Sequence, residues 1–222
     1  ILDNLFKETY ISDIVKRNKI RNVGEMEALL DILSSAIGAL TNPNKLQKTF
    51  KSVNRSKITA TTITKYIEYL EDAFLIEEAV RYDIKGKSYI GTPLKYYFMD
   101  TGLRNARINY RQIEITHSME NVIYNELRMR GFSVDVGNLT IVENGKDGKA
   151  VKKQLEVDFI CNKGSKKYYI QSAYQLGTEE KLAQEIRPFL KINDSFKKIV
   201  ITSDTPKPCY TDEGILMMNV YD

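Results

Sequence analysis

The sequence predicts an α+β protein in which a helical N-terminal domain precedes a mixed α/β sheet domain. Two patterns predict this fold class. Residues 23–74 carry apolar side chains at steps of three and four, which is the spacing of amphipathic helices. Residues 133–220 instead contain short runs rich in β-branched and aromatic residues, separated by turn residues, which is typical of strands. With 222 residues, the chain is long enough for one or two domains with a substantial core.

Composition and termini exclude several classes of protein. No window approaches 18 consecutive apolar residues, so we expect no transmembrane helix, no membrane partner and a cytoplasmic location. The two cysteines, Cys161 and Cys209, have no His or Cys at metal-ligand spacing, so they predict neither a disulfide framework nor a zinc site. The chain begins Ile-Leu-Asp-Asn without an initiator Met, and we therefore expect it to be part of a longer protein.

The N-terminal domain is predicted to be a winged helix over residues 23–112. After a helical lead-in over 1–22, the spacing predicts helices over 23–41, 45–50 and about 60–73, the last capped by Thr59 or Thr61. Strands over Leu75–Tyr82 and Leu94–Met99 follow, with a loop containing two glycines and a proline between them. Three helices and a β-hairpin in this order are typical of a winged helix. Asp100 is then placed to cap a short helix.

Basic residues gather just before the third helix, because residues 44–57 contain five Lys and Arg side chains and no acid. Such residues can contact phosphates, and short polar side chains on the helix can reach base edges. The predicted DNA-binding residues are Lys45, Lys48, Lys51, Arg55, Lys57, Thr61, Thr62, Lys65, Lys85 and Lys87. The alternative is a solvated basic face on a winged helix that binds protein. Glu68, Glu71 and Asp72 favour that alternative, because they would repel a phosphate backbone.

The C-terminal domain, residues 113–222, is predicted to form an α/β sheet. A helix from Ser118 ends at Gly131. The predicted strands cover Ser133–Gly137, Leu139–Val142, Leu155–Cys161, Tyr168–Tyr174, Lys198–Thr202 and Gly214–Val220. A long polar turn over 144–148 precedes the third strand, and a helix over Glu179–Leu190, broken at Pro188, follows the fourth.

The predicted hairpin over 156–176 carries the candidate chemistry. Asp158 lies on its first strand, as a candidate for an Asp that ends such a strand, and Gln171-Ser172-Ala173 lies on its second. This arrangement resembles the metal-dependent nucleases of the restriction-endonuclease fold, in which an Asp on one strand is followed by Glu-x-Lys on the next. There, carboxylates hold Mg²⁺ against the scissile phosphate, and the Lys stabilises the attacking water or the developing charge. Here an amide stands at the carboxylate position and a methyl group at the ammonium position.

Five segments carry a wider resemblance. They are Leu70-Glu71-Asp72-Ala73-Phe74-Leu75-Ile76, Tyr96-Tyr97-Phe98-Met99-Asp100-Thr101-Gly102-Leu103-Arg104-Asn105, Glu120-Asn121-Val122-Ile123-Tyr124-Asn125-Glu126-Leu127, Glu156-Val157-Asp158-Phe159-Ile160 and Tyr169-Ile170-Gln171-Ser172-Ala173-Tyr174. With these segments the chain resembles the C-terminal region of bacterial and archaeal AAA-type ATPases, a domain of unknown function. The resemblance implies a winged helix, then a restriction-endonuclease-like domain, with an ATPase module upstream and residues 1–22 as the link to it. No Gly-x-x-x-x-Gly-Lys-Ser/Thr occurs in the sequence, so we expect ATP to bind only through that module.

Three functions remain open. The preferred one is a non-catalytic module of an AAA-type ATPase that binds DNA through its winged helix, with a degenerate nuclease domain and no cofactor of its own. The second is a Mg²⁺-dependent DNA nuclease using Glu120, which the resemblance places on the first helix of the nuclease domain, and Asp158. The missing second carboxylate and ammonium group argue against a nuclease, because losing one such electrostatic group costs about 10²–10³ in rate. Lys166, Lys167 or Lys181 could replace the missing ammonium group. The third is a protein-interaction or regulatory module of the ATPase. His117 has no Ser or Cys partner in the sequence pattern, so we expect no catalytic dyad.

Overall fold

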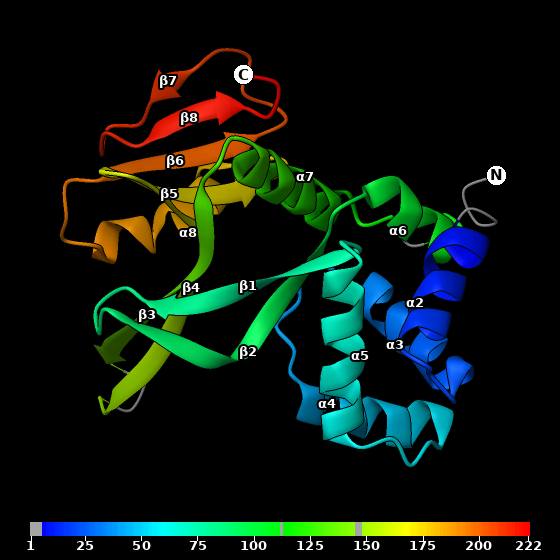
Figure 1. Cartoon of the computed structure of the whole chain (residues 1–222). Coiled ribbons are helices and arrows are strands. Elements are labelled where there is room, and N and C mark those ends of the chain that lie inside the picture. The colour runs from blue at the N-terminus through cyan, green and yellow to red at the C-terminus, as the bar shows by residue number, and fades with distance from the viewer. Residues whose placement is uncertain (1–5, 112, 145–147) are drawn as a thin grey trace. The chain divides into compact units, whose positions relative to one another are not determined.

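The computed structural model describes residues 6–111, 113–144 and 148–222, and the chain divides into two compact units (Figure 1). Unit 1 comprises residues 1–78 and 92–121, and unit 2 comprises residues 79–91 and 122–222. The first five residues of the predicted lead-in helix, and residues 145–147 of the predicted polar turn, lie outside the described residues. No helix in the described ranges has both the length and the apolar character needed to cross a bilayer.

Unit 1 consists mainly of helices. In chain order they are η1 (Phe6–Ile11), α2 (Ser12–Arg17), α3 (Val23–Ser35), α4 (Pro43–Thr49), η2 (Phe50–Asn54), α5 (Ala60–Asp72) and α6 (Thr101–Arg107). Side chains of Asn22, Asn42 and Thr59 accept hydrogen bonds from the first turns of α3, α4 and α5, so the predicted Thr59 cap is confirmed. Helix α3 ends at Ser35, before the predicted residue 41, because a turn through Gly38 (φ 71°) follows it.

The apolar stripes of these helices form the core of unit 1. Helix α5 contacts both α3 and α4, and most of the stripe predicted for each helix is buried. Phe74 is the exception, because it follows the end of α5 at a positive φ and is 80% exposed. The fully buried members include Met26, Leu29 and Leu30 of α3, Phe50 of η2, and Ile63 and Leu70 of α5. Burying one such side chain contributes roughly 1.5–3 kcal/mol, so this stripe accounts for the stability of helices that are each only two to four turns long.

The predicted hairpin is confirmed as β1 (Ile76–Asp83) and β2 (Ser88–Phe98), which are neighbours in the sheet. The tip is shorter than predicted because β2 already begins at Ser88. Within unit 1, Thr41 forms a bridge to Leu94 through two backbone hydrogen bonds of 2.8 Å. The segment before α4 is therefore joined to β2 by an isolated β-bridge. Asp100 then caps α6, as predicted, by accepting from the N–H of Leu103 at 2.9 Å.

Strands dominate unit 2. Helix α7 (Ile115–Met129) enters this unit and ends before Gly131 (φ 79°), as predicted. The further elements are β3 (Ser133–Asn144), β4 (Ala150–Lys163), β5 (Lys166–Ala173), α8 (Glu179–Ile186), η3 (Phe189–Lys191), β6 (Lys197–Thr202), β7 (Cys209–Tyr210) and β8 (Leu216–Asn219). The eight-stranded sheet has the order β2-β1-β3-β4-β5-β6-β8-β7. Strands β3, β4 and β5 are antiparallel, whereas β5, β6 and β8 are parallel (Figure 1).

Three sequence predictions for unit 2 are corrected. The strands predicted on either side of Asn138 form one strand, β3, because its long pairing with β4 continues past a register shift between Asp135 and Gly137. Asp158 lies inside β4 and not at its end. The helix predicted to reach Leu190 ends at Ile186, and a 3₁₀ turn follows Pro188. The short edge strand β7 was not predicted.

The core of unit 2 lies between the sheet, α8 and η3, and it contains Val157, Tyr169, Phe189, Val200 and Ile215. Cys161 is fully buried on β4, and burial raises the pKa of its thiol to about 12. Cys161 therefore serves as a small apolar residue of the core.

Candidate functional site

Glu120 lies in unit 1, on α7, at the centre of a buried polar cluster. Its Oε1 accepts hydrogen bonds from Lys95 Nζ at 2.8 Å and from the Tyr97 hydroxyl at 2.6 Å. Lys95 and Glu120 are only 3% and 5% exposed. Burial alone would raise the pKa of Glu120, but His117, Lys95 and Tyr97 together outweigh it and hold that pKa below its usual value. The carboxylate is therefore ionised and already paired.

His117 and Gly38 complete this cluster. Nδ1 of His117 lies 3.7 Å from Glu120 Oε2, and its Nε2 lies 3.3 Å from a Glu114 oxygen. Glu120 is the main cause that raises the pKa of His117; burial opposes it and Glu114 adds to it. A Cβ at Gly38 would lie 3.0 Å from His117 Nδ1 and 3.3 Å from Glu120 Oε2. The backbone at residue 38 thus approaches the cluster closely and leaves little space for a ligand.

Asp158 is held in unit 2 by the neighbouring strand. Its Oδ2 accepts from the Ser172 N–H at 2.8 Å, and its own N–H donates to Gln171 Oε1 at 3.4 Å. The other end of the Gln171 amide donates to Glu185 Oε2, on α8, at 3.2 Å. Burial raises the pKa of Glu185, and the Gln171 hydrogen bond and the Lys181 charge oppose that rise. The amide therefore bridges the Asp158 segment and a second carboxylate.

This arrangement differs from the metal centre that the nuclease hypothesis requires. Glu120 is paired with Lys95 and Tyr97 within unit 1, and Asp158 and Gln171 are hydrogen-bonded to protein groups within unit 2. Ala173, at the position of the lysine in the nuclease motif, is 2% exposed and packs in the apolar core. In the described ranges, no three His, Cys, Asp or Glu side chains are grouped in a way that could hold a metal ion. Asp158, Gln171 and Glu185 offer Mg²⁺ two carboxylates and one amide oxygen.

Sequence reasoning missed Lys95, Tyr97 and Glu185. Lys95 and Glu185 each carried a weak signal. Lys95 is a cation within the apolar run Leu94–Met99, and a buried lysine requires a carboxylate partner. Glu185 falls between Leu182 and Ile186 on the apolar side of an amphipathic helix. In both cases the unexpected residue was a charge on a face that should be apolar.

The basic residues predicted before α5 line a groove of about 590 Å³ in unit 1. Lys48, Lys51, Arg55 and Lys57 contribute the charge, and all four are exposed. The carboxylates of the described residues form no ion pair with them within 4.0 Å. The loop is fixed by Gln47, whose Nε2 donates to the Ile58 carbonyl at 3.1 Å. The groove therefore presents four uncompensated positive charges on a fixed backbone.

A second groove, of about 510 Å³, lies beside the N-terminal half of α5. Thr61 and Lys65 line it, together with Asn42 and Asn44 at the start of α4, and Glu68 lies at its far end. Two predicted DNA-binding residues have local partners instead. Lys45 donates from Nζ to the Leu40 carbonyl at 2.9 Å, and the Thr62 hydroxyl lies 3.0 Å from that of Thr59. Lys85 and Lys87 belong to unit 2.

Comparison with known proteins gives one family and two relatives. The family described as Domain of unknown function (DUF8612) matches residues 1–114. An uncharacterized protein of Haemophilus influenzae is 35% identical over 222 residues, which cover 100% of this chain and 51% of that protein. The uncharacterized protein MJ1544 of Methanocaldococcus jannaschii is 30% identical over 228 residues, which cover 100% of this chain and 46% of that protein. The chain thus spans about half the length of the curated relatives it matches.

A solved structure shows a weaker similarity. The crystal structure of protein VC1899 from Vibrio cholerae matches 99% of this chain and 53% of that chain, with 12% sequence identity and a TM-score of 0.29. A TM-score this low carries no argument about fold or function.

Proposed function

We propose that unit 1 is a winged helix that binds duplex DNA and that unit 2 is a nuclease-like fold without catalysis. The chain itself belongs to the DUF8612 family of domains of unknown function. The observation that carries the proposal is the groove of Lys48, Lys51, Arg55 and Lys57, whose four charges have no carboxylate partner within 4.0 Å among the described residues. The residues of this groove directly precede α5 in the sequence, and α5 takes the place of the recognition helix in a winged helix.

The order of elements in unit 1 supports the winged-helix part of this proposal. Helices α3, α4 and α5 are followed by the β1–β2 hairpin, and an isolated β-bridge joins Thr41, between the first two helices, to Leu94 of β2. This is the order expected of a winged helix. The exposed side chains Thr61, Thr64 and Lys65 lie on one face of α5. They are of the kinds that reach phosphates and base edges.

Acidic residues restrict the proposed contact to the N-terminal half of α5. Glu68, Glu71 and Asp72 follow in its C-terminal half. Burial, and next Glu78, raise the pKa of Glu71 to about 7, so this carboxyl carries only part of its charge near neutral pH. The repulsion of a phosphate backbone at this end is correspondingly weaker than three full charges would produce.

The hydrogen bonds of Gln171 support a non-catalytic unit 2. Its amide joins the Asp158 backbone to the Glu185 carboxylate, where a nuclease would place a metal-binding carboxylate. Losing one transition-state-stabilising group costs about 10²–10³ in rate. The Lys of the nuclease motif is also replaced, by Ala173 in the core. Both replacements favour binding over cleavage.

An ATPase module is the proposed partner of this chain. The support is the resemblance of its segments to the C-terminal region of AAA-type ATPases, together with the greater length of the two relatives. In this proposal ATP binds to that module, and the chain supplies the contact with DNA.

The DNA-binding proposal is tested by fluorescence anisotropy with a duplex of about 20 base pairs, titrated from about 50 to about 200 mM salt. Four phosphate contacts predict a slope of log K against log salt of about −3 to −4. Lys51→Glu is expected to weaken binding at least about tenfold and to make the slope shallower by about 1. Lys16→Glu, at an exposed position on α2, makes the same change in charge away from the groove and is the matched control.

Two results would contradict the proposal. The first is no saturable binding to the duplex at the lowest salt. The second is an equal loss for Lys16→Glu and Lys51→Glu, which would mean that net charge alone, and not the groove, attracts DNA. Mg²⁺- or Mn²⁺-dependent cleavage of the duplex that Asp158→Ala abolishes would instead establish the nuclease alternative.

A further inference from the structure

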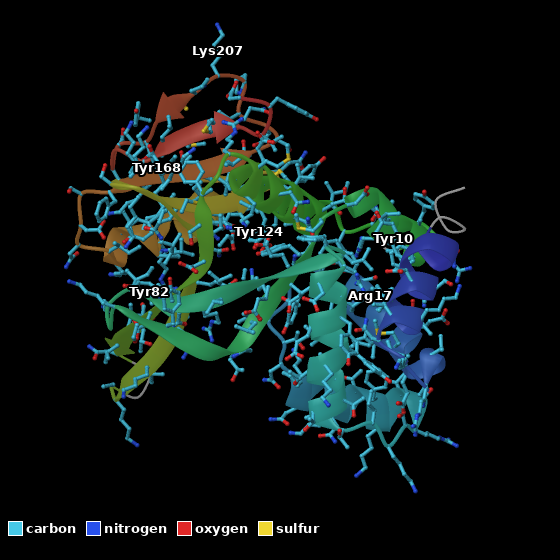
Figure 2. The ribbon with its side chains drawn as sticks, viewed as in Figure 1. Tyr10, Arg17, Tyr82, Tyr124, Tyr168 and Lys207 are labelled. Atoms are coloured by element: carbon cyan, nitrogen blue, oxygen red, sulfur yellow. The ribbon has the colours of Figure 1, made fainter. Side chains whose placement is uncertain are left out.

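A cavity of about 500 Å³ opens in unit 2, between the tip of the β1–β2 hairpin, strand β5 and the segment that joins η3 to β6. Tyr82, labelled in Figure 2, lies at its wall. Lysines and aromatic residues make up most of its lining. These residues, named the lysine pocket below, are Lys85, Lys87, Lys167, Lys191, Tyr82, Tyr169 and Phe196.

Three aromatic rings hold the ammonium group of Lys167. Its Nζ lies 5.2 Å from the ring centroid of Tyr169, 5.3 Å from that of Phe196 and 5.7 Å from that of Tyr82. Each distance is within the range of a cation–π interaction. In the ranges that the structure describes, no carboxylate lies within 4.0 Å of this ammonium group. Its position is therefore fixed while its charge remains available to an anion.

Asp194 is the acid in the wall of the cavity, and its two oxygens are engaged with the protein. Oδ2 accepts from the Tyr169 hydroxyl at 2.7 Å, and Oδ1 accepts from the Phe196 N–H at 3.2 Å. These bonds hold the two rings that flank Lys167. The carboxylate thus shapes the wall. The lining contains four lysines and this one acid, and its net charge is positive although Asp135, outside the lining, offsets part of the Lys167 charge.

The hairpin tip that carries Lys85 and Lys87 has a defined conformation. Asp83 Oδ1 accepts from the N–H groups of Lys85 and Gly86 at 3.1 and 3.0 Å. A Cβ at Gly86 would lie 2.8 Å from Asp83 Oδ2, so a larger residue there would displace the carboxylate that holds this turn. Lys87 has a φ of 52°, in the left-handed region that is unfavourable for a side chain. Strain of this kind concentrates at functional sites.

We infer that the lysine pocket binds a nucleoside phosphate. Lysines present donors without acceptors, so they select a negatively charged group. The Phe196 ring is 41% exposed and offers a surface on which a base can stack. A cavity of about 500 Å³ also falls in the size range of small-molecule sites. A free nucleotide and the 5′-phosphorylated end of a single strand share this chemistry.

The lysine pocket is separate from the proposed DNA groove. Every residue that lines it belongs to unit 2, whereas Lys48, Lys51, Arg55 and Lys57 belong to unit 1. The inference therefore does not depend on duplex binding. It also assigns Lys85 and Lys87 to a pocket for a small ligand, in place of the contact between wing and duplex that the sequence predicted.

Isothermal titration of the whole chain with AMP tests the inference, with adenosine and inorganic phosphate as the two halves of the ligand. AMP is expected to bind saturably and at least about tenfold more tightly than either half. A 5′-phosphorylated single strand of about ten nucleotides, compared with its 5′-hydroxyl form, distinguishes the two sources. Tighter binding of the phosphorylated strand than of both AMP and the 5′-hydroxyl strand identifies a strand end, and binding of AMP with equal affinities for the two strands identifies a free nucleotide. The inference is overturned when neither AMP nor the strand binds, or when phosphate alone binds as tightly as AMP.

Variants of adjacent lysines on β5 locate the site. Lys167→Gln is expected to weaken AMP binding about tenfold, since it replaces a charge-assisted hydrogen bond to the phosphate by a neutral one. Lys166→Gln is the matched control, because successive strand residues face opposite sides and Lys166 does not line the cavity. Lys191→Gln, at an exposed position, repeats the test without disturbing the aromatic rings. Equal affinities of the Lys166, Lys167 and Lys191 variants would overturn the assignment.

Discussion

Replacing Lys95 by methionine tests whether Glu120 has a structural role. The change keeps the length of the side chain and removes only the ammonium group that lies 2.8 Å from Glu120 Oε1. Glu120, 5% exposed, would then be a buried carboxylate supported by Tyr97 and His117 alone. Removing one partner of a buried ion pair costs about 3–5 kcal/mol. Because domains are stable by about 5–15 kcal/mol, this loss would bring unit 1 close to unfolding.

Urea denaturation followed by circular dichroism measures the loss. Lys95→Met/Glu120→Leu should recover most of the stability lost by Lys95→Met, because it leaves no buried charge unpaired. Arg17→Met is the control. Arg17, labelled in Figure 2, lies 3.9 Å from Asp13, and this pair is more than half exposed, so its removal should cost less than about 0.5 kcal/mol.

A cost of less than about 1 kcal/mol for Lys95→Met would refute this reasoning, because it is the value of an exposed pair. A double variant no more stable than the single one would refute it as well. The result also bears on the nuclease alternative. A carboxylate whose charge is needed by Lys95 is a poor ligand for Mg²⁺, since the cation would have to displace the ammonium group.

Three further predictions follow. The folded pKa of His117 is raised above its ordinary value of 6.5, so the stability that the protonated imidazole contributes is complete below that pH and is lost as the pH rises through the folded pKa. The Tm should therefore fall as the pH rises above 6.5, and a His117→Gln variant with the same fall would contradict this. Gln171→Glu places a third carboxylate beside Asp158 and Glu185 and should lower the Tm, with Mn²⁺ restoring part of it; no response to Mn²⁺ would exclude a latent metal site. Gly137→Ala should lower the free energy of unfolding by about 1–3 kcal/mol, because the new Cβ would lie 2.8 Å from the Cβ of Val157 on β4. An unchanged midpoint in urea denaturation would show that β3 can shift to make room for it.

Features that depend on neighbouring residues were predicted well from the sequence. The caps at Thr59 and Asp100, and the end of α7 at Gly131, are confirmed because each depends on residues within one or two turns. The split predicted within β3 was wrong for the opposite reason. Gly137-Asn138 is a turn signal when only neighbours are considered, but β3 pairs with β4 on both sides of it, and the long ladder outweighs the local preference.

The polar sites were predicted only in part, because their partners are distant in the sequence. Glu120 was singled out, but Lys95, its partner 25 residues earlier, was not. Lys167 was noted as a replacement ammonium, whereas its position is set by Tyr82 and Phe196, which precede and follow it by many residues. Only tertiary structure brings such groups together, and helical or strand periodicity carries no information about them.

The division of the chain also affects the order in which it can fold during synthesis. The chain passes from one unit to the other after residues 78, 91 and 121. When residues 1–112 have been made, Lys95 and Tyr97 still lack Glu120, and the N–H of Phe98 still lacks the Asn121 side chain that accepts from it at 2.8 Å. Residues 81–83 must likewise wait for residues 136–138 of β3. The helices α3–α5 can therefore pack first on the ribosome, while the hairpin between them and α7 stays incomplete until the start of the second unit has been translated.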